Sequence, residues 1–296
     1  MSSAELRSGS DSATGGLEAL AAQVGRGGVF VLTGAGLSTD SGIPDYRGRD
    51  GLRRVMPMSF GEFMGSRGAR QRYWARSYVG WQRFRAAVPN SGHRRVADLQ
   101  QWGLVDYLVT QNVDGLHQQA GSEQVEELHG SLAEVMCVTC GDRTARAHVQ
   151  ERLMLANPGF LGAVLDTLPG GSQVSSQIRP DGDIVVPDDA IGVFHPPRCL
   201  VCGADTLKPD VVFFGESVPK DRVERCFAAV ERSCSVLVLG SSLAVMSGYR
   251  FVRRAAASGI PVAVLTRGVT RAEAEATLRV DAALGPTLDA LVAALR

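Results

Sequence analysis

The 296-residue sequence predicts an α/β protein: a parallel sheet with helices on both faces, joined to a second, smaller lobe. Two observations predict the sheet. Short apolar runs recur along the chain, and amphipathic stretches lie between them. A third observation predicts the small lobe, because two stretches interrupt the alternation. One is rich in aromatic residues and the other contains four of the six cysteines. The length fits one large domain or two unequal ones.

The apolar runs mark the expected strands. They are apolar on both faces, as strands of a covered parallel sheet are. In chain order they are 28–32, 107–109, 211–214, 236–239 and 262–265. Helices are expected where apolar residues recur at i, i+3, i+4 and i+7. The clearest sets are Val223, Cys226, Phe227 and Val230, and Leu288, Leu291, Val292 and Leu295. Such alternation is typical of a doubly wound, Rossmann-like sheet.

The two interruptions divide the chain into segments. Residues 1–16 are expected to form a flexible tail, because they are rich in Ser, Gly and Asp and show no helical or strand period. The predicted Rossmann-like domain comprises 17–53, 88–131 and 207–296. The small lobe combines a helical insertion at 54–87 with a cysteine-containing module at 132–206.

Charge and hydropathy exclude several classes of partner. Lys+Arg and Asp+Glu each number 31, so the formal net charge is zero. This gives no basic surface for nucleic acid and no field that would hold the chain on an anionic membrane. No apolar run approaches the ~18 residues of a membrane span, and the first sixteen residues lack the apolar core of a signal peptide. We expect a cytoplasmic protein, and its oligomeric state does not follow from the sequence.

Four cysteines are spaced as metal ligands. They form two Cys-x-x-Cys pairs, each followed by a glycine that permits a tight turn. Four thiolates fill the tetrahedral coordination of Zn²⁺ and leave no position for water, so the predicted zinc is structural. Two redox-active or free thiol pairs are the alternative. We expect the metal to staple a module that has little core of its own. The predicted ligands of the zinc-ribbon are Cys137, Cys140, Cys199 and Cys202.

A glycine-containing segment follows the first expected strand. Thr33-Gly34-Ala35-Gly36-Leu37-Ser38 is expected to open a helix whose backbone N–H groups bind a cofactor's pyrophosphate. A plain turn is the alternative. Thr39 stands where the third glycine of G-x-G-x-x-G would be, and no acidic residue occupies the usual ribose position. A dinucleotide bound here would therefore take a non-standard orientation.

Further polar segments follow the strands. They are 39–48, 111–117, His129-Gly130 and Gly240-Ser241-Ser242. The carboxyl ends of parallel strands meet at one edge of the sheet, where open α/β sheets bind ligands. We therefore expect these segments to converge on one site. The remaining histidines (His93, His117, His148 and His195) are expected to be structural, and Cys226 and Cys234 to be buried small hydrophobes.

In this order the motifs resemble those of the sirtuin family. They are T-G-A-G-x-S, G-I-P-D-Y-R, Q-N-V-D-x-L-H, an isolated His-Gly, the two cysteine pairs and G-S-S-L-x-V. The resemblance runs from about residue 27 to the C-terminus. Residues 70–81, residues 208–216 and the long gap between the cysteine pairs resemble the class II branch, in its bacterial form.

The resemblance implies an NAD-consuming deacylase that removes acyl groups from protein lysines and releases nicotinamide and O-acyl-ADP-ribose. It implies His129 as general base, a role that suits an imidazole with an ordinary pKa near 6.5. By the same resemblance Asn112 orients the ribose or a water, and Asp114 holds the nicotinamide carboxamide. The implied cofactor-binding residues are Gly34, Ala35, Gly36, Ser38, Asp45, Tyr46, Arg47, Gln111, Asn112, Val113, Asp114, Gly240, Ser241, Ser242, Thr266, Arg267, Gly268 and Leu284.

The expected substrate is an acyl-lysine protein segment bound in extended form. The resemblance implies that it is clamped between the strand at 211–214 and the segment Met246-Ser247-Gly248. One departure from the family concerns the cofactor. Thr266-Arg267-Gly268 stands where sirtuins commonly place an Asn that meets the adenosine ribose.

The acyl preference rests on a pair of side chains. Tyr73 and Arg76 lie at i and i+3 of an expected helix, and sirtuins that remove acidic acyl groups are similar in using Tyr-x-x-Arg near this point. The alternative is a solvated arginine face with Tyr73 packed among Trp74 and Trp81. The flanking residues, which follow the class II pattern, favour that alternative.

Two other functions stay open on the sequence. A mono-ADP-ribosyltransferase would use the same cofactor and leave ADP-ribose on its target. A non-enzymatic zinc-ribbon protein would bind partners or nucleic acid without NAD, but zero net charge and the retained His129, Asn112 and Asp114 count against it.

Overall fold

The computed structural model describes residues 15–167 and 179–296. A helix over 15–24 precedes strand β1 (Val29–Thr33). The expectation of a flexible tail over 1–16 is therefore wrong for residues 15 and 16, which are helical because Leu20 and Val24 pack fully buried against the sheet. The rest of that predicted tail, 1–14, lies outside the described residues.

The large lobe contains a parallel sheet of six strands in the order β3-β2-β1-β7-β8-β9. β1 pairs in parallel with β2 on one side and with β7 on the other, so the strand order reverses between β1 and β7. The doubly wound sheet predicted from the sequence is confirmed. Besides β1 its strands are β2 (Val105–Thr110), β3 (Val125–Glu127), β7 (Ser235–Leu239), β8 (Val262–Leu265) and β9 (Leu278–Val280).

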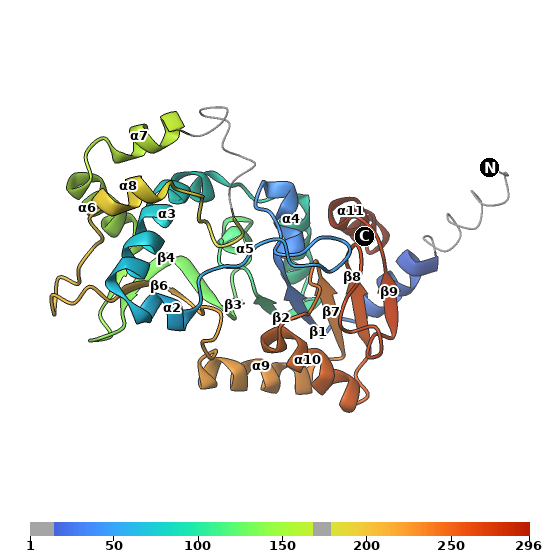
Figure 1. The fold of residues 1–296 in the computed structure, drawn as a ribbon. Helices are drawn as coiled ribbons and strands as arrows, with labels where there is room; N and C mark the ends of the chain where they lie inside the picture. The colour runs from blue at the N-terminus through green and yellow to red at the C-terminus, as the bar shows by residue number, and fades with distance from the viewer. Residues whose placement is uncertain (1–14, 168–178) are drawn as a thin grey trace.

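Helices cover both faces of this sheet, and β1 shows why (Figure 1). Val29 and Val31 enter one apolar core, whereas Phe30 and Leu32 enter the other, because successive side chains of a strand point to opposite faces. The first core is closed by helix 15–24, α4 (Ser91–Gln101) and α11 (Leu284–Ala294), and the second by α9 (Lys220–Arg232) and α10 (Met246–Ala257). No helix in 15–167 or 179–296 is long and apolar enough to cross a membrane.

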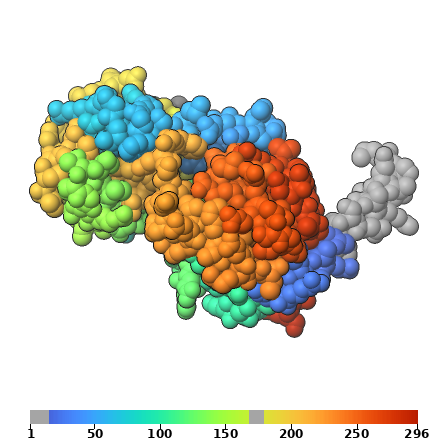
Figure 2. Space-filling view, turned by 90° about the horizontal axis from the view of Figure 1, so that it is seen from below, coloured from blue at the N-terminus to red at the C-terminus, as the bar shows by residue number. Residues whose placement is uncertain are grey.

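The small lobe has an antiparallel sheet of three strands in the order β5-β4-β6. Its helices lie beside one another at the opposite end of the molecule from β9 (Figure 1). In Figure 2 the C-terminal segments, coloured red, lie at the end of the molecule away from the small lobe. The strands are β4 (Gly130–Cys137), β5 (Arg143–Ala145) and β6 (Leu207–Val211). The helices are α2 (Phe60–Gly65), α3 (Arg67–Ala86), α6 (Arg146–Ala156), α7 (Phe160–Thr167) and α8 (Asp188–Val193).

One expected strand is wrong. Residues 211–214 do not form a parallel strand of the large sheet: β6 ends at Val211 and pairs antiparallel with β4. The run is apolar for another reason. Phe213 enters the core of the small lobe, while its neighbours line the cavity described below.

The cysteine module does not form its core alone. Trp74 of α3 is fully buried, and its indole N–H donates to the carbonyl of Leu207 at 2.9 Å. The buried Arg146 guanidinium lies 5.0 Å from the ring centroid of Trp74 and 4.9 Å from that of Trp81. The aromatic insertion and the cysteine module thus share one core.

Gly80 provides a test of how closely α3 packs against the segment that leads into α8. A Cβ at position 80 would lie 1.9 Å from the carbonyl oxygen of Gly182. Gly80→Ala should lower the free energy of unfolding by about 1–2 kcal/mol, because the clash outweighs the ~1 kcal/mol that alanine gains in a helix. Denaturant unfolding measures it. Gly68→Ala, at an open position of the same helix, should instead leave stability equal or slightly higher. Equal effects at both positions would contradict this close approach.

Candidate active site

A cavity of about 1170 Å³ opens at the carboxyl ends of β1, β2, β7 and β8, beside the reversal of strand order. The polar segments that follow these strands converge there, as expected. The predicted residues that line it are Gly34, Ala35, Gly36, Ser38, Asp45, Tyr46, Arg47, Gln111, Asn112, Val113, Asp114, His129, Gly240, Ser241, Ser242, Thr266, Arg267 and Leu284. Gly268 is not among the described lining residues. A Cβ there would meet the backbone of Arg49 at 2.2 Å, so Gly268 packs against the 45–54 loop instead.

The segment after β1 does not open an α-helix, contrary to expectation. It forms two short 3-10 turns, Ala35–Leu37 and Thr39–Ser41. Its glycines are required by a close approach to the loop after β7. A Cβ at Gly34 would lie 2.7 Å from that of Ser241, and one at Gly36 would lie 2.8 Å from the carbonyl oxygen of Gly240. The backbone of this segment is therefore held against the neighbouring loop before any ligand binds.

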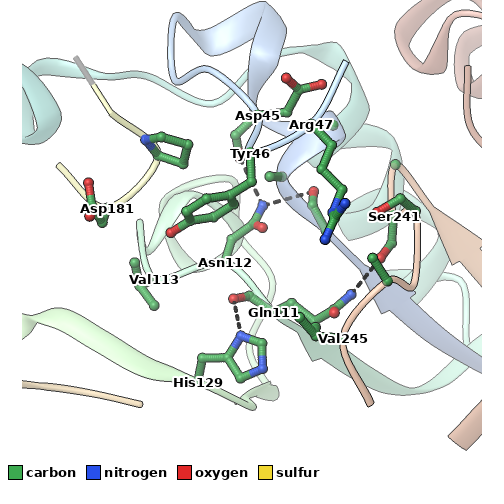
Figure 3. A pocket seen from close by; sticks show the side chains of 18 of the residues that line it. Asp45, Tyr46, Arg47, Gln111, Asn112, Val113, His129, Asp181, Ser241 and Val245 are labelled. Carbon is green, nitrogen blue, oxygen red and sulfur yellow. Dashed lines mark hydrogen bonds between the residues drawn. The ribbon is translucent and has the colours of Figure 1, made fainter. Parts of the chain in front are cut away.

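The loop after β7 carries backbone strain at the cavity. Leu243 has a φ of 52°, in the left-handed region that non-glycine residues rarely adopt. Ser241 stabilises this conformation, because its hydroxyl oxygen accepts the N–H of Leu243 at 3.2 Å and the side-chain amide of Gln111 at 2.9 Å. Figure 3 shows Gln111 and Ser241 linked in this way.

Ser38 joins two of the predicted functional residues. Its hydroxyl donates to Oδ2 of Asp114 at 2.7 Å and accepts from the side-chain amide of Asn112 at 3.0 Å. Asn112 also donates to the carbonyl of Gly34 at 3.1 Å. Burial raises the pKa of Asp114, although the N–H of Leu116 and the Ser38 hydroxyl oppose that effect. The three side chains form one polar group on the cavity wall.

Two histidines lie beneath this group, closer to the site than their predicted structural role suggested. Nε2 of His93 is 3.5 Å from the Ser38 hydroxyl, and Nε2 of His117 is 3.0 Å from the Thr33 hydroxyl. Both rings are buried, and burial lowers the pKa of His93 to about 4 and that of His117 to about 3. No pattern in the sequence connects His93 with Ser38, which are 55 positions apart. The exposed His148 and His195 lie away from the cavity.

His129 reaches the cavity from the turn before β4 (Figure 3). Its Nδ1 lies 2.9 Å from the carbonyl oxygen of Gln111, which can only accept, so Nδ1 carries the proton. Nε2 is then the basic atom, and the Ser247 hydroxyl 2.9 Å away donates to it. Burial lowers the pKa of His129 to about 4. At neutral pH the ring is uncharged and its Nε2 is available as a proton acceptor.

The small lobe contributes residues to the cavity that the sequence did not indicate. Pro180 and Asp181 line it, and Figure 3 shows Asp181 on the same side of the pocket as Tyr46. Tyr73 also lines it, but it is 3% exposed and packs edge-on against Trp74 and Phe63. Arg76 is not among the described lining residues.

One of the segments expected to clamp a substrate peptide begins a helix. Met246-Ser247-Gly248 is the first turn of α10 and cannot pair as an edge strand. The adjoining residues 241–245 belong to no helix or strand, and they line the cavity together with 211–216.

The four predicted metal ligands form one cluster. Their sulfur atoms all lie within 4.8 Å of one another, with Cys137 and Cys202 3.6 Å apart and Cys140 and Cys199 3.7 Å apart. Four thiolates ~2.3 Å from a tetrahedral zinc would lie ~3.8 Å from each other, so the cluster fits this ion. Two matched turns bring them together, because Gly141 and Gly203 have φ values of 77° and 74° and donate back to Cys137 and Cys199.

The environment of Cys137 favours its thiolate. Burial raises the pKa of this thiol, but hydrogen bonds from the N–H groups of Cys140 and Thr139 and from the Thr206 hydroxyl outweigh burial and bring it to about 6. Outside the cluster, Cys226 is buried as expected, whereas the expectation for Cys234 is wrong. Cys234 is exposed because it lies in the turn between α9 and β7.

Together the fold and the site define a two-lobed α/β enzyme with a nucleotide-type crevice and a closed four-thiolate metal site. The family model described as "Sir2 family" matches residues 34–247, and the chain belongs to this family. A protein of Streptomyces coelicolor (strain ATCC BAA-471 / A3(2) / M145), called NAD-dependent protein deacetylase 1, is 52% identical over 88% of this chain and 84% of its own length. One of Mycobacterium avium (strain 104), with the same designation, is 50% identical over 86% of each chain.

Solved structures of Sir2 enzymes have a similar fold. One described as "Structural Basis for the Mechanism and Regulation of Sir2 Enzymes" aligns with a TM-score of 0.70 at 26% identity, covering 94% of this chain and 97% of the other. Another, "Sir2-p53 peptide-NAD+", aligns with a TM-score of 0.69 at 27% identity, covering 90% and 92%.

Removing one thiolate tests the metal site. Cys137→Ser should reduce the zinc content measured by mass spectrometry to well under one ion per chain and lower the melting temperature, because three thiolates hold the ion less tightly. Cys234→Ser, which changes an exposed cysteine outside the cluster, should keep full zinc. Full occupancy and unchanged melting in Cys137→Ser would overturn the zinc assignment.

The buried histidines predict a pH dependence of stability. The folded-state pKa of His117 is about 3 against an ordinary value near 6.5, so between these values the unfolded chain binds more protons. The free energy of unfolding should therefore fall as the pH drops below 6.5, by about 1.4 kcal/mol per pH unit from this residue. His117→Gln should flatten that slope between pH 6.5 and 4, measured by urea unfolding at each pH. The exposed His148→Gln should not change it. Identical slopes in both variants would argue against a buried neutral His117.

Proposed function

We propose that this chain is an NAD-dependent protein-lysine deacetylase that transfers the acyl group to ADP-ribose and releases nicotinamide. The observation that supports it most directly is one arrangement in the cavity. A neutral histidine, whose basic nitrogen contacts only the Ser247 hydroxyl among the described hydrogen bonds, lines the same cavity as the Ser38–Asn112–Asp114 group. The designations of the relatives as NAD-dependent protein deacetylases support the same activity.

The dimensions of the cavity fit two substrates. Its volume of about 1170 Å³ exceeds the roughly 300–1,000 Å³ of sites for a single drug-sized ligand. The proposal assigns the diphosphate to Gly34, Ala35 and Gly36, and the adenosine end to the loops at 240–242 and 266–267 with Leu284. Asp45, Tyr46 and Arg47 then cover the nicotinamide end.

The chemistry needs a leaving group and a base. NAD would supply an electrophilic ribose carbon: the acyl oxygen of the lysine would bond to it as the bond to nicotinamide breaks, and a water would then displace the lysine from the acyl carbon. Asp114, fixed by Ser38 and by the N–H of Leu116, accepts from the nicotinamide carboxamide. His129 accepts the proton of a ribose hydroxyl at Nε2, while the Gln111 carbonyl holds Nδ1–H and fixes the ring.

The peptide would lie in extended form between 211–216 and 241–245, so that backbone hydrogen bonds hold it.

We further propose that zinc has a structural role. The reduced cysteine cluster and the use of NAD suit a cytoplasmic location.

Replacing the base tests the proposal. His129→Ala should bind NAD nearly as the unmodified protein does, measured by calorimetry. With an acetyl-lysine peptide it should release nicotinamide about 10²–10⁴-fold more slowly, because a general base contributes that much. His195→Ala, at an exposed position away from the cavity, should keep full activity. If His129→Ala kept more than about a tenth of the turnover, the base role would be wrong.

The products separate deacetylation from the alternative that uses the same cofactor. Mass spectrometry of the reaction mixture should show the deacetylated peptide and O-acetyl-ADP-ribose in equal amounts. ADP-ribose attached to the protein target, with the acetyl group retained on lysine, would indicate a mono-ADP-ribosyltransferase instead.

A further inference from the structure

Lys208 is a buried lysine beneath the cavity wall formed by 211–216. It lies in β6 and is 2% exposed. Its ammonium group donates to the carbonyl of Val211 at 2.6 Å and to Oε2 of Glu216 at 3.0 Å. The same nitrogen lies 4.8 Å from the ring centroid of Phe213. All of these contacts are to the 211–216 loop.

Glu216 closes that loop from its other end. Its Oε2 accepts the backbone N–H of Phe213 at 2.8 Å, and its own N–H donates to the carbonyl of Phe213 at 2.9 Å. Gly215 between them has a φ of 86°, which permits the tight turn. One carboxylate oxygen thus binds the lysine ammonium and a backbone N–H of the loop together.

This loop is connected to the base. The N–H of Val212 donates to the carbonyl of His129 at 2.8 Å, and the carbonyl of Phe214 accepts from the N–H of Phe60 at 2.9 Å. Every residue from Val211 to Glu216 lines the cavity. The loop and residues 241–245 both line the cavity into which His129 reaches.

We propose that the Lys208–Glu216 ion pair is a positioning device that holds the 211–216 backbone in the conformation required to bind the acyl-lysine peptide. This inference rests on the proposed function. Lys208 lies outside the cavity lining, and Glu216 lines the cavity but is not among the residues assigned to NAD or to the reacting atoms.

The reason for an ion pair is geometric. A groove that admits a peptide must leave its wall uncovered on the substrate side, so the loop can be supported only from beneath. Backbone carbonyls and N–H groups there need charged or polar partners, because apolar packing would leave them without hydrogen bonds. Lys208 supplies the donor and Glu216 the acceptor. Burial lowers the pKa of Lys208, and the charges of Glu216 and Asp210 oppose that effect.

The test separates peptide binding from catalysis. Glu216→Gln keeps the side-chain shape but removes the charge, and Lys208→Met removes the ammonium. Each should raise the KM for an acetyl-lysine peptide about tenfold or more, as the loss of a charge-assisted hydrogen bond does. The kcat and the affinity for NAD without peptide should change less than about twofold. The double variant should be less impaired than Lys208→Met, because it leaves no unpaired carboxylate at the loop.

Asp205→Asn is the matched control. This change weakens the ion pair between Asp205 and Arg70, whose side chains are 23% and 11% exposed and are thus about as shielded as the Lys208–Glu216 pair. Neither Asp205 nor Arg70 is among the residues that line the cavity. The peptide KM should stay unchanged there. A peptide KM unaffected in both single variants, or a loss of kcat and NAD affinity equal to the loss in peptide binding, would overturn the positioning role. An inactive unmodified protein that binds no NAD would instead refute the proposed function.

Discussion

Two backbone loops that approach closely at the carboxyl edge of the sheet determine where the site lies. The N–H of Gly34 donates to the carbonyl of Leu239 at 3.0 Å, and that of Gly36 donates to the carbonyl of Gly240 at 2.8 Å. The loops after β1 and β7 are thereby joined by hydrogen bonds and together form the base of the cavity, called its floor below. Because the strand order reverses here, the helices α4 and α10 that follow lie on opposite faces of the sheet and the crevice opens between the loops. The loop 45–54, α3 and 211–216 build the walls on this floor.

Burial shifts the pKa values of the groups at this site more than neighbouring charges do. Three imidazoles lie at or beneath the cavity, and in each case desolvation is the largest cause of a lowered pKa. The same effect raises the pKa of Asp114. Neutral hydrogen-bonded groups therefore surround a few fixed donors and acceptors, and the directions of their hydrogen bonds follow from carbonyl groups such as that of Gln111, which can only accept.

The sequence predicted features whose cause is local. Strands, amphipathic helices and the paired cysteine turns follow from spacing, and the convergence of polar loops follows from the geometry of parallel strands. It did not predict what depends on contacts between distant segments. The run at 211–214 is apolar because of the small lobe and the cavity, and the spacing around Gly34 reflects the loop at Gly240. The entry of Asp181 into the cavity, and the position of His93 below Ser38, likewise depend on tertiary packing.

The shared core of the small lobe has a consequence for the order of synthesis. Helix α3 ends at Ala86, but the partners of its buried aromatic face extend to Phe213. During translation the last residue of α3 is synthesised 213 − 86 = 127 residues before the last of those partners. At roughly 5–20 residues per second this delay is about 6–25 s. The nascent chain must keep Trp74 and its neighbours from associating with other chains throughout that interval, well before the completed protein has any site to fill.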